Sequence, residues 1–173
     1  MLYTSQKVNN VNLLRLLEDL TVKIKFKNGK DFDENLISDS LLNKLISEDK
    51  NVIRGRQSNL FRILDIIPTD VIKYINDELG TTVLTNFIQY PTGGYMTWHT
   101  NSDFPGERIY LAYSESGHSY FKYFDKDTNK IVEVKDNVGW SINRFMIPKL
   151  PEKFWHCVYS KTNRISIGFR VIK

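Results

Sequence analysis

The sequence predicts a mainly β fold, a sandwich or jelly-roll barrel, preceded by helices at the N-terminus. Two observations carry this prediction. Apolar residues recur at helical spacing up to about residue 80, and beyond residue 81 the chain is a series of short β-branched and aromatic runs. Turn-forming clusters rich in Gly, Pro, Asn and Asp separate these runs. Because short strands punctuated in this way are typical of sandwiches and jelly rolls, we expect an α+β chain with its sheets in the C-terminal half.

Three helices are expected before residue 81, because apolar residues spaced three and four apart define one face of each. These faces are Leu13, Leu16, Leu17 and Leu20; Leu41, Leu42, Leu45 and Ile46; and Val71, Ile72, Ile75 and Leu79. Ser38 or Asp39 can cap the second helix, and Thr69 the third. In residues 21–30, TVKIKFKNGK, lysines alternate with apolar residues, which predicts an early strand running into an Asn-Gly turn.

Strands are expected throughout the second half of the chain. The predicted strands are TTVLTNFIQY, GYMTWHT, ERIYLAYS, HSYFKYF, KIVEVK, WSINRFMI, FWHCVYS and NRISIGFRVI. We find no internal repeat, low-complexity segment or linker in the sequence. Residues 1–173 are therefore predicted to form a single domain, with a helix-rich flanking part (1–80) and a jelly-roll core (81–173).

The composition is that of an ordinary globular protein, with 41% hydrophobic and 25% charged residues. The formal net charge is only +4 and the basic residues are scattered, so nucleic-acid contact is possible but not favoured. A single cysteine, Cys157, precludes an intramolecular disulfide and favours a reducing compartment. Because no signal-like segment or membrane-length apolar run is present, we expect a cytoplasmic protein that does not contact a membrane.

Two of the three histidines fall on predicted strands far apart in the sequence. His99 ends a strand after the flexible turn PTGG, and His156 lies in KFWHCVYS. Histidines from an early and a late strand can meet across a barrel mouth and bind a divalent metal through neutral imidazole nitrogens. The alternative is that each is a packed, hydrogen-bonded strand residue. His118 has no such partner, and we expect it at the surface or behind the site.

A second cluster lies on the last strand. Strand alternation places Arg164, Ser166, Gly168 and Arg170 on one face of RISIGFR. A buried guanidinium needs an anionic partner and its fork matches a carboxylate, so this face predicts a carboxylate-binding site. The alternative is a solvent-exposed face with ordinary surface arginines. Arg108, which opens the strand RIYLAY, is expected at the barrel mouth, where it could bind an anionic substrate or cosubstrate.

His99, His156 and the Arg164–Ser166 pair, in this order on a predicted jelly roll, resemble the Fe(II)/2-oxoglutarate-dependent oxygenase superfamily over roughly residues 81–173. The run QYPTGGYMTWHT also resembles the tyrosine–Gly–Gly–tyrosine–histidine run of its prolyl-hydroxylase branch. The resemblance implies a double-stranded β-helix. It further implies an enzyme that uses iron and O₂ to oxidise 2-oxoglutarate to succinate and CO₂ and to oxidise a C–H bond of its substrate.

Site roles are carried over only where residues match. By resemblance, His99 and His156 would bind Fe(II). Arg164 and Ser166 would bind the distal carboxylate of 2-oxoglutarate, as in the family's arginine-x-serine motif. Tyr90 would help to hold the same cosubstrate, although a tyrosine here can equally be a core residue.

The sequence departs from the family at the third metal ligand. The family usually places Asp or Glu two residues after the first histidine, and this chain has Asn101 there. Three possibilities stay open. Asn101 can bind the metal through its amide oxygen, Asp103 can replace it by a bend in the loose turn TNSDFPG, or the position is open to water or to an anion such as chloride. A site without functional iron is a fourth possibility.

These features predict a 2-oxoglutarate-dependent dioxygenase, a hydroxylase acting on a protein or peptide side chain or a small metabolite. One alternative is a non-catalytic jelly-roll binding module. Another is a nucleic-acid dealkylase of the same superfamily, because the spacing of Arg164 and Arg170 resembles the paired arginines of those enzymes. The prime substrate, the choice between hydroxylation and halogenation, and the oligomeric state do not follow from the sequence.

Overall fold

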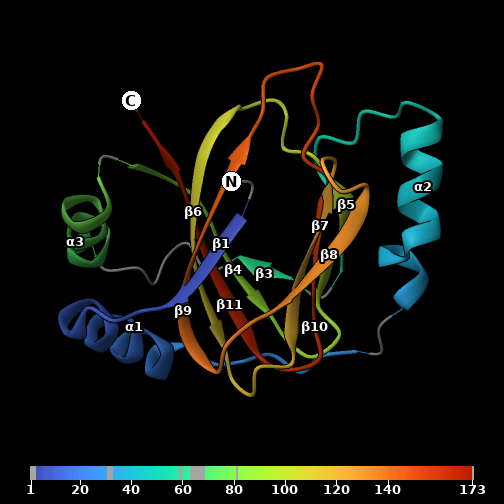
Figure 1. Cartoon of the computed structure of the whole chain (residues 1–173). Helices are drawn as coiled ribbons and strands as arrows, with labels where there is room; N and C mark the ends of the chain where they lie inside the picture. Colours follow the sequence, from blue (N-terminus) through green and yellow to red (C-terminus); the bar gives the residue numbers. More distant parts are fainter. Residues whose placement is uncertain (1–2, 31–32, 59, 63–68, 81, 173) are drawn as a thin grey trace.

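The computed structural model describes residues 3–30, 33–58, 60–62, 69–80 and 82–172. Two antiparallel β-sheets pack face to face, and helices lie on the outer sides (Figure 1). The helices are α1 (Val11–Lys23), the 3₁₀ helix η1 (Glu34–Ile37), α2 (Asp39–Ser47) and α3 (Thr69–Leu79). The strands are β1 (Tyr3–Lys7), β2 (Gln57–Ser58), β3 (Phe61–Arg62), β4 (Thr82–Tyr90), β5 (Tyr95–His99), β6 (Gly106–Ser114), β7 (Ser119–Asp125), β8 (Lys130–Lys135), β9 (Gly139–Ile147), β10 (His156–Ser160) and β11 (Arg164–Val171).

The strand order is that of a jelly roll. One sheet has the order β1-β9-β6-β11-β4-β3, and the other has the order β2-β5-β10-β7-β8. From β4 onward the chain crosses between the sheets at every connection except the β7–β8 hairpin, so β4 lies beside β11 and β5 beside β10. This double Greek-key arrangement confirms the predicted jelly-roll class, and β4 to β11 correspond to the eight predicted strands.

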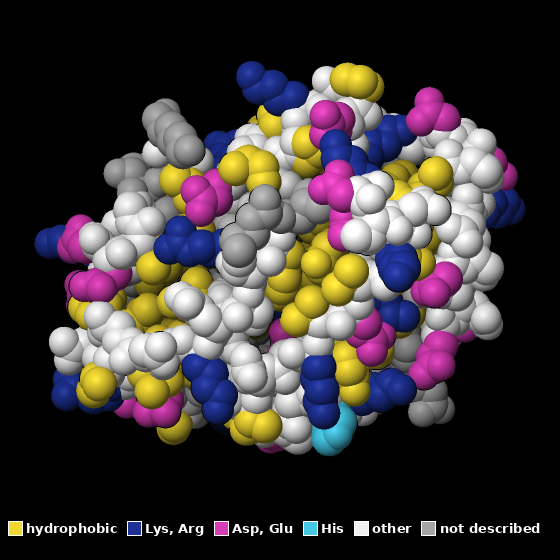
Figure 2. Space-filling view, viewed as in Figure 1, with side chains coloured by type: hydrophobic (Ala, Val, Ile, Leu, Met, Phe, Trp, Pro, Cys, Tyr) yellow, Lys and Arg dark blue, Asp and Glu magenta, His cyan; other side chains and the backbone are white. Residues whose placement is uncertain are grey.

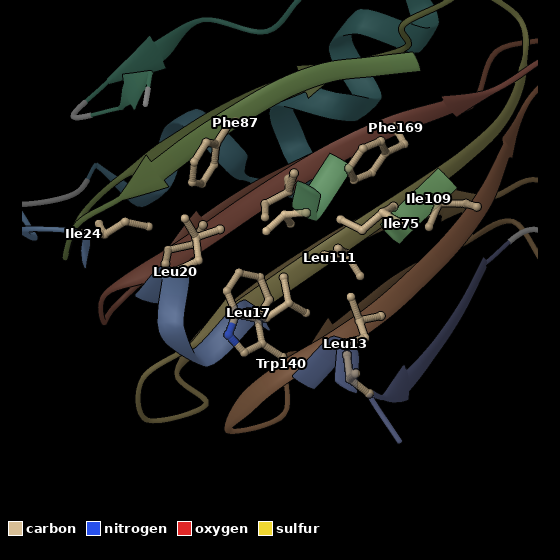
Figure 3. Packing of buried hydrophobic residues seen from close by; sticks show 14 residues of the cluster. Leu13, Leu17, Leu20, Ile24, Ile75, Phe87, Ile109, Leu111, Trp140 and Phe169 are labelled. Atoms are coloured by element: carbon tan, nitrogen blue, oxygen red, sulfur yellow. The ribbon is translucent and has the colours of Figure 1, made fainter. Parts of the chain in front are cut away.

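Helices α1 and α3 cover the outer face of the six-stranded sheet (Figures 1 and 3). Leu13, Leu17 and Leu20 of α1 and Ile75 of α3 are fully buried there. The sheet residues beneath them include Phe87, Ile109, Leu111, Trp140, Ile165, Ile167 and Phe169. On β11 the odd-numbered residues therefore face the helices, so the even-numbered residues, which include the two arginines, point between the sheets.

The predicted early strand at residues 21–30 is wrong. Helix α1 continues to Lys23, and residues 24–30 contain no strand. The Thr21 hydroxyl donates to the Leu17 carbonyl at 2.8 Å and accepts a hydrogen bond from Trp140 Nε1 at 3.0 Å, which ties the last helical turn to the sheet. The N-terminus supplies a different strand, β1, which pairs with β9.

Helices η1 and α2 cover the outer face of the five-stranded sheet. Cys157 is fully buried in this layer, away from the space between the sheets, and burial raises the pKa of its thiol. On the face shown in Figure 2, basic and acidic side chains are interspersed and no purely basic surface is visible. Among the described residues, no helix has the length and apolar character needed to cross a membrane.

Candidate active site

A pocket of about 400 Å³ lies between the two sheets. Its described lining residues include two histidines, four arginines and one acid. They are Arg54, Gln57, Thr85, Asn86, Ile88, Tyr90, Met96, His99, Asn101, Asp103, Phe104, Arg108, Tyr110, His156, Val158, Arg164, Ser166 and Arg170. All the sequence-predicted site residues thus line one pocket, although they come from both sheets and from the segment between β5 and β6.

His99 and His156 are brought together by strand pairing. β5 and β10 are adjacent and antiparallel, with His99 directly opposite His156, and the two ring centroids are 4.1 Å apart. Both side chains are at least 97% buried, with exposed fractions of 3% and 1%. The jelly-roll topology thus places these two histidines, 57 residues apart in the sequence, on neighbouring strands.

Backbone carbonyls fix how both histidine rings are oriented. His99 Nδ1 lies 2.8 Å from the Thr97 carbonyl oxygen, and His156 Nδ1 lies 2.9 Å from that of Phe154. A carbonyl oxygen can only accept, so each Nδ1 carries the proton and donates it, which leaves the lone pair of the neutral ring on Nε2. This tautomer is the one that binds metals through Nε2.

Burial keeps both rings neutral. It lowers the pKa of His99 to about 4. It also lowers the pKa of His156 well below its usual value, and the nearby positive charges of a protonated His99 and of Arg108 act in the same direction. At neutral pH both imidazoles are therefore in the form that a divalent cation requires.

Asn101, and not Asp103, reaches the histidine pair. The Asn101 amide nitrogen lies 3.0 Å from His156 Nε2, and the residue has a left-handed backbone (φ 51°), which Asn tolerates better than most residues. The Asp103 carboxylate instead pairs with Arg54, with Oδ2 of Asp103 3.6 Å from Nη2 of Arg54. Within the described part of the chain, no group of three or more His, Cys, Asp or Glu side chains could hold a metal ion. The donors that converge are two imidazoles and a neutral amide.

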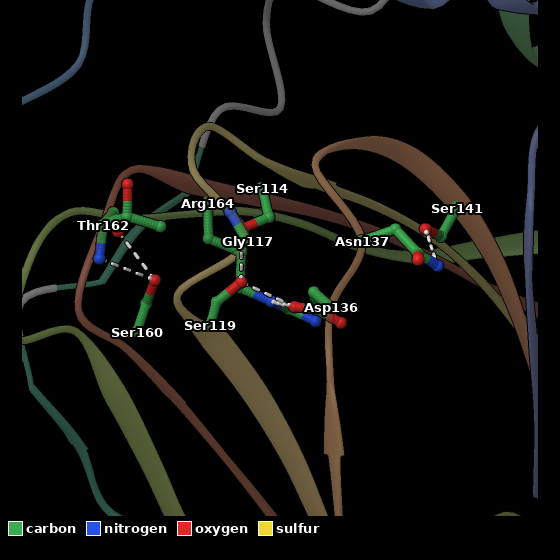
Figure 4. A network of polar contacts seen from close by, with 9 residues as sticks. All are labelled: Ser114, Gly117, Ser119, Asp136, Asn137, Ser141, Ser160, Thr162 and Arg164. Atoms are coloured by element: carbon green, nitrogen blue, oxygen red, sulfur yellow. Dashed lines mark hydrogen bonds and ion pairs between the residues drawn. The ribbon is translucent and has the colours of Figure 1, made fainter.

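Arg164 lies at the inner end of the pocket and already has an acidic partner (Figure 4). Its Nε donates to Asp136 Oδ2 at 2.7 Å, and Ser119 Oγ donates to the same oxygen at 2.7 Å. Both Arg164 and Asp136 are almost fully buried. Burial alone would lower the Arg164 pKa, but the Asp136 carboxylate, together with Tyr90 and Tyr3, raises that pKa, so the guanidinium stays charged.

Sequence reasoning missed Asp136. A buried Arg164 guanidinium was expected to need an anion, but that anion was expected to be the carboxylate of a ligand. Asp136 follows β8 in the segment DNVG, which reads as an ordinary turn. The sequence signal for such an acid was that a buried Arg164 needs an anionic partner. Which acid supplies the negative charge depends on how the two sheets pack.

Tyr90 and Ser166 lie beside Arg164 in the same pocket. Tyr90 is directly opposite Arg164 on β4, and its ring centroid is 5.0 Å from the guanidinium carbon. Burial raises the pKa of Tyr90, so its hydroxyl stays protonated. Gly168 separates Ser166 from Arg170 on β11, and any side chain there would collide with the Tyr110 ring. The residues predicted to hold a carboxylate are thus gathered in one place.

His118 stands apart from the site. It is exposed and contacts Ser116 at 3.1 Å, consistent with the expectation that it belongs to the surface.

The sequence matches no protein-family model and no curated protein. Two similar solved structures are prolyl hydroxylases. A prolyl-4-hydroxylase from Pseudomonas putida is 13% identical, with 98% of this chain and 92% of that chain covered and a TM-score of 0.47. A Trichoplax adhaerens prolyl hydroxylase, in complex with a hypoxia inducible factor oxygen degradation domain peptide fragment, is 15% identical, with coverages of 97% and 82% and a TM-score of 0.49.

Proposed function

We propose that this chain is an Fe(II)- and 2-oxoglutarate-dependent oxygenase that hydroxylates a protein side chain or a small metabolite. The observation that carries the proposal is the His99–His156 pair. Two neutral, buried imidazoles with their Nδ1 atoms fixed on carbonyls lie in one pocket with a buried arginine, a serine and a tyrosine. Purely structural histidines do not require a common pocket of this composition.

The donor set fits a divalent transition metal. His99 and His156 would bind Fe(II) through Nε2, and Asn101 lies where its amide oxygen could replace the amide nitrogen by rotation about the Cβ–Cγ bond. Bound Fe(II) would supply the redox chemistry that activates O₂. A neutral third ligand leaves the metal with more positive charge than a carboxylate would, and this favours an additional anionic ligand such as a cosubstrate carboxylate.

At the inner end of the pocket, Arg164 would hold the distal carboxylate of 2-oxoglutarate. Arg164 Nε already donates to Asp136, and the Arg164 Nη1 atom has no hydrogen-bond partner among the described residues. The terminal edge of the guanidinium thus remains to receive a carboxylate, with the Ser166 and Tyr90 hydroxyls beside it. Asp136 would act as a positioning residue that fixes the direction of this edge.

Anaerobic addition of Fe(II) and 2-oxoglutarate to the purified protein tests the proposal. We expect the weak visible charge-transfer band of a 2-oxoglutarate–Fe(II) complex. His99→Ala should abolish the band, whereas His118→Ala, the matched control outside the pocket, should retain it. Arg164→Lys should weaken 2-oxoglutarate binding because a lysine lacks the planar fork. Absence of the band, together with absence of stabilisation by Fe(II) or Mn(II), would contradict the proposal.

A non-catalytic binding module is the second candidate. Two observations favour it: no acidic side chain joins the histidine pair in the described residues, and Arg164 already has Asp136 as a counter-charge. In that case the pocket would bind a ligand without metal. Metal analysis of protein purified without chelators separates the two, because the module would contain no iron and would gain no stability from Fe(II), Mn(II) or 2-oxoglutarate.

A further inference from the structure

Two arginines of the pocket lie directly opposite each other. Arg108 on β6 and Arg170 on β11 are Cα partners in adjacent antiparallel strands, and both line the pocket. Like charges at directly opposite positions of such a pair repel each other and destabilise the sheet. An arrangement of this kind is stable when an anion binds between the two guanidinium groups.

The protein itself supplies little counter-charge at this position. Neither Arg108 nor Arg170 forms an ion pair within the part of the chain that the structure describes. Asp103 is the one acid among the described lining residues, and its carboxylate lies 3.6 Å from Arg54. The Arg170 guanidinium carbon lies 5.0 Å from the centroid of the Phe104 ring, which is a contact with an aromatic face rather than with an anion.

Of the two arginines, Arg108 gives the stronger indication that an anion binds here. Its side chain is only 4% exposed, and its Nη2 donates to the Phe104 backbone carbonyl. Its Nη1 is buried and has no hydrogen-bond partner among the described residues. Leaving a buried guanidinium nitrogen without an acceptor costs free energy, so this nitrogen requires an acceptor that the described chain does not provide.

We propose that Arg108 and Arg170 bind an oxyanion group of the substrate, a carboxylate or a phosphate, at the outer part of the pocket. The identity of the ligand as the substrate rests on the proposed function, whereas the anion site itself rests on the arginine pair. This site is separate from the inner carboxylate site. Arg164 lies at the start of β11, beside Tyr90 and Asp136, whereas Arg170 lies near the end of the same strand. Burial of Arg108 favours a small group that enters the pocket over a polymer phosphate lying on the surface.

The position of the pair relates the anion to the chemistry. Arg108 and Arg170 line the same pocket as His99 and His156. A substrate held by its oxyanion at Arg108 and Arg170 would place its neighbouring carbon atoms towards the histidine pair. The inferred substrate class is therefore a small molecule, or a side chain, that carries a carboxylate or phosphate close to the carbon that is oxidised.

Thermal unfolding of the metal-free protein with simple anions tests this inference. Inorganic phosphate and acetate are added separately at constant ionic strength, with sodium chloride as the balance. At about ten times the dissociation constant, we expect the melting temperature to rise by about 3 °C for a chain of this length. Arg170→Gln and Arg108→Gln should each lose most of this rise. Arg144→Gln removes an arginine paired with Glu107 outside the pocket lining, so it is the matched charge control and should keep the rise.

Each outcome decides the inference. A rise with both anions supports a shared oxyanion site, a rise with phosphate alone assigns a phosphorylated substrate, and a rise with acetate alone assigns a carboxylate. No rise with either anion, or equal rises in the wild type and in Arg170→Gln, overturns it. If Arg108→Gln does not fold, the melting-temperature rise of Arg170→Gln, a substitution at a partly exposed position, tests the inference by itself. Because no iron is used, a protein without the charge-transfer band can still show the anion effect, and the two proposals can fail separately.

Discussion

Asn101 combines a left-handed backbone (φ 51°) with a side-chain amide 3.0 Å from His156 Nε2. Aspartate tolerates the same backbone conformation, so Asn101→Asp can add a carboxylate without new strain. An anionic oxygen beside two neutral imidazoles strengthens the attraction for a divalent cation. We predict that Asn101→Asp binds Mn(II) more tightly than the wild type by about tenfold, or about 1.4 kcal/mol. Titration followed by calorimetry measures this change.

Asp103→Asn is the matched comparison for Asn101→Asp. Its carboxylate lies near Arg54 rather than near the histidines, so we expect the Mn(II) affinity to change less than twofold. A large loss in Asp103→Asn with no gain in Asn101→Asp would identify Asp103 as the metal ligand. Activity of Asn101→Asp adds a second measurement: a gain marks the native metal site as weakened, and a loss marks the neutral ligand as required.

The two buried histidines predict how stability depends on pH. The pKa of His99 is held at about 4, whereas an unfolded histidine titrates near 6.5. Between these values the unfolded chain binds more protons than the folded one, so stability falls as the pH falls through this window. The His99 shift alone predicts a loss of about 2 kcal/mol in the unfolding free energy of metal-free protein from pH 7.5 to pH 5. His156 acts in the same direction.

Urea unfolding at the two pH values measures the histidine effect. His99→Gln should reduce the pH dependence, because one of the two depressed groups is gone. His118→Gln should leave it unchanged, because His118 is exposed and outside the pocket. Equal pH dependence in the wild type and in His99→Gln would show that His99 is not held neutral by burial.

At the scale of elements, Asp136 connects the two sheets. It follows β8 and accepts hydrogen bonds from Ser119 on β7 and from Arg164 on β11 (Figure 4). Breaking a buried ion pair by removal of one charge leaves the other charge uncompensated. We predict that Asp136→Asn lowers the free energy of unfolding by about 3 kcal/mol, measured by urea denaturation. Asp127→Asn, in the exposed turn after β7, should stay within about 0.5 kcal/mol of the wild type.

The same variant tests the carboxylate site. In Asp136→Asn, the amide oxygen can still accept the hydrogen bond from Arg164 Nε and keep the guanidinium in place, but Arg164 lacks its counter-charge. We therefore expect 2-oxoglutarate to raise the melting temperature more than it does in the wild type. An equal rise in both proteins would show that 2-oxoglutarate does not bind at Arg164. A stability loss below about 1 kcal/mol would show that the buried pair contributes little net free energy.

From β4 onward, strand identity was predictable from the sequence, but β1 to β3 and the strand register were not. Alternating apolar runs and turn clusters identified β4 to β11, and alternation on β11 placed Arg164 and Ser166 on one face. The opposition of Arg108 to Arg170 depends on how two strands far apart in the sequence align, and no local pattern encodes that alignment. The early strand at residues 21–30 failed because packing of α1 against Trp140 outweighed the alternating lysines.

At the scale of the whole molecule, the jelly-roll order explains why two histidines distant in the chain meet. The connections that cross between the sheets place β5 beside β10, and this adjacency follows from the fold class once eight strands are recognised. What the fold class does not specify is which loop residues turn inward. Asp136 and Asn101 both lie outside the strands, and their contacts with Arg164 and His156 arise only after the sheets have packed.

The layered architecture separates stability from the site, and this separation can be tested on α1. Leu17 is fully buried between α1 and the outer face of the six-stranded sheet (Figure 3). Val22 on the same helix is 87% exposed. Leu17→Ala should lower the free energy of unfolding by about 3 kcal/mol, because it removes buried methyl groups and leaves a cavity. Val22→Ala should change it by less than about 0.5 kcal/mol. Because the sheet lies between α1 and the pocket, folded Leu17→Ala should bind Mn(II) with wild-type affinity. A fall in affinity of tenfold or more at a temperature where the variant is fully folded would show that the outer layer and the histidine pair are coupled.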